Sequence, residues 1–463
     1  MKNRILKFIL LIFISTLLGI GSKSIGLNTS QSLSIAIFSV SILGTLFFWD
    51  FRLSFAFLGT SMLLIARVID LENLIKFSSL EVILFLVGMM VIIGLLKDAG
   101  FFAWIVTLIL RIPRLTAKKF VFYIAVISAL LACAVDEVTS IIFMVAAVLE
   151  ICDYFEVDAV PYIIISVLAT NIGSAGTVLG NPIGILIASK SGLNFEDFIL
   201  KAFPLMIFCL LTAILILTLW YRHSLKKLDQ QIKKLGSNEM FLHLISVPPD
   251  KQTRIALTIF ATTILSIAFS HRINLFFNLQ ANTVLLIIPL ISAAFIMIWK
   301  HNKAREFIEK DVEWWTLLFF LFLFAQAGAL KYTGATDVLA KKLLSATSNN
   351  PQLLTGVVLW LSTIGSSILD NVVLVAAFIP VVQSFQTLNL NLHPLWWALL
   401  FGGCLGGNIT LVGSTANIVA LGIIEKEKNI RITFFRWFWV GLTVGVVTTS
   451  IVWLALTFLP FYR

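Results

Sequence analysis

The chain has 463 residues, of which 59% are hydrophobic and 13% are charged, and its formal net charge is +10 at pH 7. A soluble domain carries about 25% charged residues, so this composition excludes a soluble globular protein and indicates a polytopic integral membrane protein. The basic excess indicates cytoplasmic loops rather than a nucleic-acid partner, because Lys and Arg accumulate on that side of membrane proteins.

Apolar runs follow one another along most of the chain. The first run comes directly after basic residues and no cleavage site follows it, so we interpret residues 1–30 as an extra N-terminal transmembrane helix rather than a signal peptide. Many of the other runs approach or exceed the roughly 20 residues that a spanning helix needs, and together they predict about 11 transmembrane helices. These runs lie near 31–48, 53–69, 80–97, 120–152, 159–189, 202–221, 255–270, 281–299, 313–330, 352–386, 394–421 and 437–458.

Two of these runs, about 120–152 and about 352–386, are too long for one span and carry acidic residues in the middle. The acidic residues are Asp136 with Glu137 in the first run, and Asp370 in the second. A charge at mid-membrane is costly and should face protein or water. We therefore predict two re-entrant hairpins, each with its polar tip at membrane depth and away from lipid.

The long polar stretch 222–254 divides the chain nearly in half, and we interpret it as a cytoplasmic linker. With the N-terminus in the cytoplasm, the inner segments hold 24 of the 34 Lys and Arg residues. This bias favours the proposed orientation over its inverse and places the C-terminus outside. The expected location is a bacterial inner (plasma) membrane.

The two halves of the chain share sequence blocks in one order. GLLKDAG at 94–100 matches GALKYTG at 328–334, which lies 234 residues later, and Asp136 falls on Asp370 at the same offset. A third pair of blocks, GSAGTVLGNPIGI and GGNITLVGSTANI, matches at an offset of 233. Three ordered matches at nearly one offset predict an internal duplication.

The duplication predicts repeat 1 at 31–221 and repeat 2 at 255–463. The predicted topology puts the mouth of the first hairpin inside and that of the second outside. The two repeats are therefore expected to be inverted, as in many secondary transporters, with scaffold and transport domains built from both.

Each repeat also contains a predicted broken helix, at about 159–189 and about 394–421, with Gly, Thr, Ser and Asn in its middle. Unwinding a helix frees backbone N–H and C=O groups, and the N-terminus of a half-helix can hold an anion. Small residues that serve only close helix packing are the alternative. The predicted ion- or substrate-binding residues are Asp136, Glu137, Thr139, Ser174, Gly176, Thr177, Gly180, Asn181, Asp370, Asn371, Asn408, Thr410, Gly413, Ser414, Thr415 and Asn417.

Hard oxygen ligands of this kind suit Na⁺ rather than a soft metal. The candidate Na⁺ ligands are Asp136, Asp370, Asn181 and Asn408 with adjacent backbone carbonyls, and H⁺ is the other candidate coupling ion. No cofactor is expected. Glu137 is open to two interpretations, since it could line the site or lie on the hairpin flank and pair with a lysine.

The segment 402–426, GGCLGGNITLVGSTANIVALGIIEK, closely resembles the last signature of the melanosomal P protein and its bacterial relatives. LDNVVLVAAFIPVV (369–382) and NIGSAGTVLGNPIG (171–184) are similar to the hairpin and first-break signatures of the same group. That group stands with arsenite permeases and NhaD-type sodium/proton antiporters in the ion transporter superfamily. The likeness runs from about residue 80 to the end and is interrupted at the linker.

The resemblance implies a fold like that of the divalent-anion/sodium symporters, with a scaffold that forms a homodimer. It implies a secondary active transporter, either an antiporter or a symporter. Such a protein moves a small inorganic or organic ion by an elevator-type alternating-access mechanism coupled to Na⁺ or H⁺. An enzyme is not expected, because the sequence has no HExxH, GxSG or paired-aspartate Gly-Asp motif. The alternatives are an arsenite or oxyanion efflux permease, for which Cys133 and Cys404 near the site would matter, and an anion channel.

The first repeat departs from the family pattern at three positions. Glu137 stands where the family usually has asparagine, and Asn181 and Gly184 replace the usual aspartate and asparagine of the first break. The acidic charge has in effect moved from the break to the hairpin tip. The distinctive chemistry of this transporter is therefore expected in its first half.

Overall fold

The computed structural model describes residues 2–102, 104–105, 115–235, 250–279, 283–388 and 390–462. Helices are the only regular secondary structure among these residues. Nine of the described helices are long and apolar enough to cross a membrane, or up to eleven if each of two bent helix pairs counts as one span. The prediction of an all-helical membrane protein with about 11 spans is therefore confirmed.

Long helices alternate with short helical turns along both halves of the chain. The first half contains α1 (Lys2–Ser24), α2 (Thr29–Phe47), η1 (Trp49–Phe51), α3 (Arg52–Ile65), α4 (Leu71–Phe77), α5 (Leu80–Asp98), α7 (Ala117–Ala134), α8 (Glu137–Tyr154), α9 (Val160–Gly173), α10 (Pro182–Ser191), α11 (Phe195–Asp197), η2 (Phe198–Ala202), α12 (Phe203–Trp220) and α13 (Arg222–Leu235). The second half contains α15 (Lys251–Ala268), α16 (Ser270–Phe276), α17 (Thr283–Trp299), η3 (His301–Lys303), α18 (Ala304–Glu306), η4 (Phe307–Asp311), α19 (Trp314–Tyr332), α20 (Ala335–Ala346), α21 (Pro351–Ile368), α22 (Asn371–Ser384), η5 (Phe385–Leu388), α23 (His393–Gly406), α24 (Thr415–Lys428), α25 (Phe434–Phe458) and η6 (Pro460–Tyr462).

The helix boundaries of the two halves recur at the offset seen in the sequence. The helices α5 and α19 begin at residues 80 and 314 and end at 98 and 332, an offset of 234 at both ends. The pair α7 and α21 has the same offset at both ends, and the pair α9 and α23 has an offset of 233. The division into an N-terminal helix, two repeats and a linker stays a prediction.

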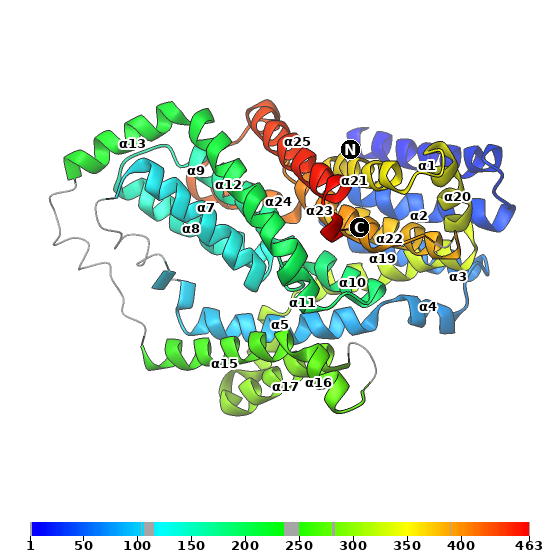
Figure 1. Cartoon of the computed structure of the whole chain (residues 1–463), viewed down its shortest axis with the longest axis horizontal. Helices are drawn as coiled ribbons and strands as arrows, with labels where there is room; N and C mark the ends of the chain where they lie inside the picture. The colour runs from blue at the N-terminus through cyan, green and yellow to red at the C-terminus, as the bar shows by residue number, and fades with distance from the viewer. Residues whose placement is uncertain are drawn as a thin grey trace.

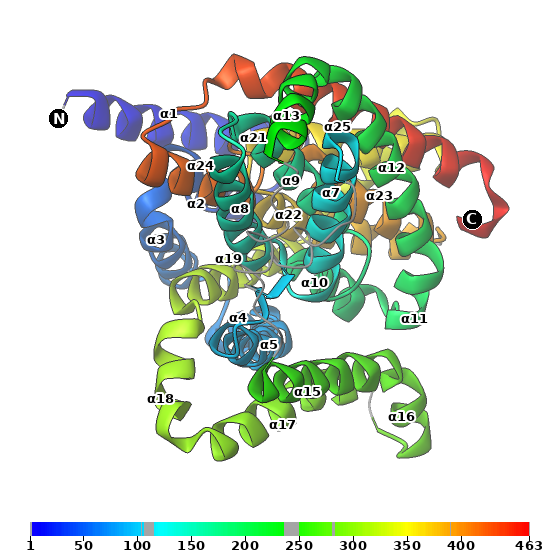
Figure 2. The ribbon, with the colours of Figure 1, turned by 90° about the vertical axis from the view of Figure 1, so that its left-hand side faces the viewer.

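The helices pack in two groups that draw on both halves of the chain. In one group α5 packs mainly against α17, and α19 packs against α3 and α4. In the other, α7 packs against α9, α21 packs against α23, and α12 and α23 both contact α25. Figures 1 and 2 both place α5 with α15, α16 and α17 along one side of the molecule. The two groups meet where α19 contacts α22 and where α5 contacts α10.

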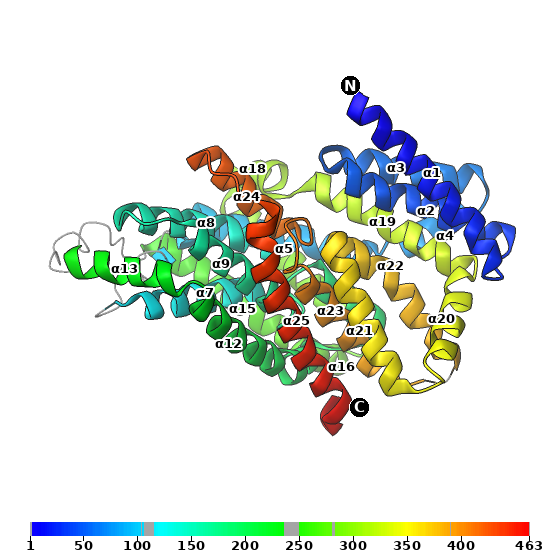
Figure 3. The same ribbon diagram turned by 90° about the horizontal axis from the view of Figure 1, so that it is seen from above.

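Both predicted hairpins are helix–turn–helix units. The first is α7 and α8 with a turn at Val135 and Asp136, and the second is α21 and α22 with a turn at Leu369 and Asp370. Figures 1 and 3 place the two hairpins on opposite sides of the centre of the molecule. The bent helix pairs lie elsewhere, at α15 with α16 (61°) and at α17 with residues 301–311 (104°).

The first part of the predicted linker is helical and docks onto the first hairpin. The Asp229 carboxylate on α13 accepts a hydrogen bond of 2.7 Å from the backbone N–H of Ala117, at the start of α7. The Tyr162 hydroxyl on α9 donates to the Ser224 carbonyl at 3.1 Å. Residues 236–249 of the linker lie outside the described residues.

Candidate functional site

The acidic residue at each hairpin tip caps the helix that follows it. Both backbone bonds to Asp136, from the N–H groups of Val138 and Thr139, measure 2.8 Å and end on Oδ1. Asp370 Oδ1 accepts from the N–H of Val372 at 3.1 Å. Acidic caps are favoured at helix N-termini because the unpaired N–H groups there carry partial positive charge. The two tips are therefore held in place by the same local bond.

The two hairpin tips meet at Glu137 and Asn371. The Asn371 amide donates to both carboxylate oxygens of Glu137, at 3.1 and 3.3 Å, and Ser414 Oγ donates to Oε1 at 3.4 Å. Both Glu137 and Asn371 are buried. Glu137 thus forms no bond to a lysine in the described part of the chain and instead joins the two hairpin tips, while its role in binding an ion stays a prediction.

The two helix breaks are the segments between α9 and α10 and between α23 and α24. A threonine in each break binds the neighbouring hairpin in the same way. Thr177 Oγ1 donates to the carbonyl of Cys133, just before the first tip, and Thr410 Oγ1 donates to the carbonyl of Ser367 at 2.5 Å, just before the second. Each hydroxyl also accepts a backbone N–H from two residues further along its break. The two hydroxyls therefore fasten the breaks to the hairpins.

Thr177→Val and Thr410→Val should each lower the free energy of unfolding by about 1–3 kcal/mol, because each leaves a buried carbonyl without its donor. The measurement is the thermal or denaturant unfolding of the purified protein. Thr212→Val is the matched control, since that hydroxyl is exposed and bonds only within its own helix. Equal stability of all three variants would contradict this fastening role.

A buried amide network joins the two breaks. The Asn171 amide on α9 donates to the side-chain oxygens of Asn408 at 3.0 Å and Asn417 at 2.9 Å. The Asn417 amide in turn donates to the carbonyls of residues 407 and 410, inside the second break. In the first break, the Asn181 amide donates to Ser174 Oγ at 3.0 Å and to Cys404 Sγ at 3.2 Å. These amides hold the unwound segments in one shape.

Four helix N-termini point toward this region, because α8, α10, α22 and α24 all begin at a hairpin tip or a break. Each carries a polar cap, formed by Asp136, Asn181, Asp370 and Ser414 respectively. Gathered helix N-termini supply partial positive charge and can bind an anion, while the carboxylates and amide oxygens among their caps can bind a cation. The geometry therefore suits a small ion together with a counter-ion.

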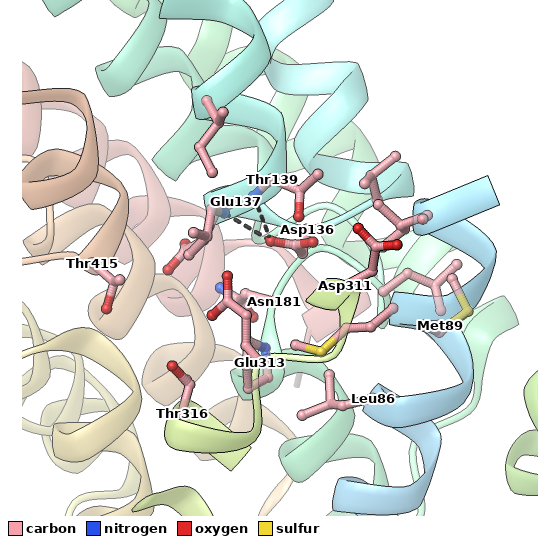
Figure 4. Close-up of a pocket in the computed structure, with 18 of the residues that line it drawn as sticks. Leu86, Met89, Asp136, Glu137, Thr139, Asn181, Asp311, Glu313, Thr316 and Thr415 are labelled. Carbon is pink, nitrogen blue, oxygen red and sulfur yellow. Dashed lines mark hydrogen bonds between the residues drawn. The ribbon is translucent and has the colours of Figure 1, made fainter. Parts of the chain in front are cut away.

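A cavity of about 230 Å³ opens beside the first hairpin tip (Figure 4). Five of the residues predicted for the site line it, and they are Asp136, Glu137, Thr139, Asn181 and Thr415. Asp370 lines a separate, smaller cavity of about 50 Å³ with Trp49. The remaining predicted residues line neither cavity and lie in the hairpin tips and helix breaks: Ser174, Gly176, Thr177, Gly180, Asn371, Asn408, Thr410, Gly413, Ser414 and Asn417.

Three charged residues near the cavities were not predicted as site residues from the sequence. Asp311 and Glu313, which precede α19, line the larger cavity together with the hairpin tip (Figure 4). Arg52, at the start of α3, is a buried cation whose ring neighbour Trp49 lines the smaller one. All three lie at the ends of apolar runs, where charges are usual, so only their packing distinguishes them from loop charges.

The two cysteines near the site have separate roles in packing. Cys133 Sγ donates to the carbonyl of Gly173 at 3.0 Å, and Cys404 Sγ accepts from Asn181. Both thiols are buried. Each thiol therefore already has a partner at a helix contact.

The comparisons with known proteins agree with this architecture. A family model described as "CitMHS: Citrate transporter" matches residues 45–402. An uncharacterised transporter of Mycobacterium tuberculosis is 29% identical over 372 residues, covering 80% of this chain and 83% of the relative. The human P protein is 25% identical over 450 residues, covering 82% of this chain and 54% of the P protein.

A solved structure supports the fold. The YdaH transporter of Alcanivorax borkumensis aligns with a TM-score of 0.54 at 14% identity, over 85% of this chain and 88% of that one. The resemblance to the P protein group is confirmed by these matches. The chain is an integral membrane transporter rather than an enzyme, and it belongs to the CitMHS citrate-transporter family.

Proposed function

We propose that this secondary transporter moves a small inorganic or organic ion in company with Na⁺ or H⁺, by symport or antiport. The observation that carries the proposal is the meeting of two hairpin tips at Glu137 and Asn371, beside two helix breaks and a cavity lined by carboxylates. Ionisable groups placed this way in a membrane protein mark an ion or proton pathway. The inverted repeats proposed from the sequence would bring the tips in from opposite sides of the membrane.

We propose an elevator mechanism in which one group of helices moves against the other. The scaffold would comprise α1 to α5 and α15 to α19, and the moving part would comprise the hairpins, the breaks and the helices packed on them. Apart from α20, which contacts both groups, the main packing between the groups is that of α19 with α22 and of α5 with α10, and this supports the division. The scaffold would form a homodimer, and the N-terminus would lie in the cytoplasm of a bacterial inner membrane.

The first experiment finds the transported ion. Purified protein is melted in the presence of Na⁺, Li⁺, citrate, dicarboxylates, sulfate or arsenite, because a ligand that binds the native state raises its stability by mass action. Citrate is included because the family model is named for it. The stabilising ion is then followed as a tracer in proteoliposomes, with a Na⁺ gradient or a pH gradient imposed separately.

The expected result is uptake that one of the two gradients accelerates. Uptake that ignores both gradients would contradict the coupling. Single-channel current steps in a planar bilayer would instead establish an anion channel. Stabilisation by arsenite that is lost when Cys133 and Cys404 are replaced by serine would establish the oxyanion permease.

A further inference from the structure

The α5 helix of the scaffold is joined to α10 of the moving part by an ion pair. Glu81 lies in the first turn of α5, and Lys190 lies in the last turn of α10. Glu81 Oε1 accepts hydrogen bonds of 2.9 Å from both Lys190 Nζ and Ser189 Oγ. The α10 helix also packs on α22 and α23, so it moves with the second hairpin and the second break in the proposed mechanism.

Two further polar contacts join the scaffold to the moving part. Arg272 on α16 pairs at 3.0 Å with Glu196 on α11, which directly follows α10. Lys331 Nζ, in the last turn of α19, donates to Gln383 Oε1 on α22 at 2.9 Å. With α20 set aside, these three contacts are the side-chain hydrogen bonds and ion pairs between the two groups whose partners the structure describes.

All three contacts lie at one end of the molecule, which we call the Glu81 end. The α5 helix has 19 residues, so its other end lies roughly 27 Å away. At that other end, Lys97 in the last turn of α5 pairs with Asp311, just before α19 begins. The last turn of α19, with Lys331, is therefore at the Glu81 end.

The cavity beside the first hairpin tip opens at the Lys97 end. It is lined along much of α5 up to Lys97, and by Glu313 at the start of α19 (Figure 4). Both of these charged residues are exposed. A second cavity, of about 240 Å³, lies between α10 and α16 at the Glu81 end, and its described lining includes none of the residues predicted for the site. The site thus reaches solvent from the Lys97 end.

The ion pair at Glu81 has no counterpart in the second half of the chain. At the offsets of the repeat, 234 and 233 residues, Trp315 and Ile423 stand where Glu81 and Lys190 stand in the first half. These side chains cannot form an ion pair. A contact made in only one of two conformations shifts the equilibrium toward that conformation.

On these contacts, and resting on the proposed elevator mechanism, we infer that Glu81, Ser189 and Lys190 form a latch that holds the transporter in the conformation open at the Lys97 end. Movement of α10 along α5 breaks both hydrogen bonds of Glu81 and allows the site to open at the Glu81 end. The other two contacts between the groups involve more exposed side chains and contribute less.

The latch is tested by the distance between two nitroxide labels, a measurement that needs no substrate. The four native cysteines are buried, so two added, exposed cysteines take the labels. Leu219→Cys near the end of α12 and Phe276→Cys on α16 replace exposed residues of the moving part and the scaffold. Pulsed electron paramagnetic resonance on the purified full-length protein then distinguishes the two conformations, because movement of α12 with the moving part changes this distance.

Glu81→Gln should raise the ratio of the second conformation to the described one about two- to fivefold, the usual effect of losing a partly exposed ion pair. Glu81→Lys should raise the ratio further, because it places two lysines opposite each other. The exchange of Glu81→Lys with Lys190→Glu should restore the wild-type ratio. Asp153→Asn is the matched control, since it breaks a similarly exposed ion pair, with Lys428, that lies within the moving part. It should leave the ratio unchanged.

Equal distance distributions for Glu81→Lys and Asp153→Asn would overturn the latch. The proposed function would then still stand if uptake by the wild type follows a Na⁺ or pH gradient. A shift in Glu81→Lys that the exchange with Lys190→Glu fails to reverse would overturn the role of Lys190. Uptake by the wild type that ignores both gradients would instead overturn the proposed coupling, whatever the distances.

Discussion

Glu137→Gln should lower cation-coupled transport by about 100-fold or more and leave the fold intact. Even the outer-shell partners of a bound cation are typically worth about 10–100-fold, and the proposed function puts the ion pathway at the hairpin tips, where Glu137 lies. Glutamine keeps the length of the side chain and an oxygen that can accept from Asn371 and Ser414, so the hairpin tips stay joined. The measurement is gradient-driven tracer flux in proteoliposomes, beside the melting temperature of the same preparation.

Exchanging the two residues sharpens this test. Glu137 and Asn371 lie 234 residues apart, the offset of the repeat, and they contact each other. Two residues related by a two-fold axis can touch only if they lie beside that axis. The double variant Glu137→Asn with Asn371→Glu should therefore restore a substantial part of the flux that Glu137→Asn alone loses. Failure of the exchange, with a folded protein, would show that the two positions are not interchangeable and that the contact of Glu137 with Ser414, at the end of the second break, is essential.

Much of this site could be predicted because its chemistry conflicts with its surroundings. Asp136, Asp370 and the two glycine-rich breaks stand out in the sequence, since charge and helix breakers are costly in a membrane helix. The internal duplication also showed which positions of the two halves correspond, because two weak signals at one offset support each other. The hairpin turns and breaks of the structure lie where these signals placed them.

The residues that escaped prediction are those whose role depends on packing alone. Arg52 and Glu313 lie at the ends of apolar runs, where charged residues ordinarily meet water, and only the packing of their helices brings them near the cavities, since α19 contacts α3, α5 and α22. Asn171 lies inside a helix, before the break that attracted attention, and its role comes from partners about 240 residues away in the chain. Such partnerships leave no local pattern in a single sequence.

For the same reason, the sequence could not show which partners the predicted threonines bind. Their hydroxyls suggested ligands, but Thr177 and Thr410 donate to the carbonyls of Cys133 and Ser367. A break in a membrane helix has to satisfy the backbone groups that it frees, and some polar side chains in it serve that need. Spacing does not distinguish a threonine that binds the backbone from one that faces the cavity, as Thr415 does.

Gly173→Ala and Gly406→Ala should each destabilise the protein by about 3 kcal/mol, a large loss for the addition of one methyl group. A methyl group at Gly173 would lie 2.3 Å from the carbonyl oxygen of Ala129, and one at Gly406 would lie 2.3 Å from that of Thr363. These glycines end α9 and α23 where they cross α7 and α21, so the crossing backbones are in direct contact. Close backbone approach at a small residue is how membrane helices pack tightly.

The clash at Gly173 cannot be relieved by trimming a side chain, because the atoms that the methyl group meets first belong to the backbone of Ala129. Ala129→Gly should therefore fail to rescue Gly173→Ala. Gly422→Ala is the matched control, since nothing lies within 4 Å of a methyl group there, and it should melt with the wild type or slightly above it. The measurement is the melting temperature, with the yield of monodisperse protein as a second readout. Because Gly173 and Gly406 make the same contact in the two halves, a severe loss at one and none at the other would refute the equivalence of the two crossings.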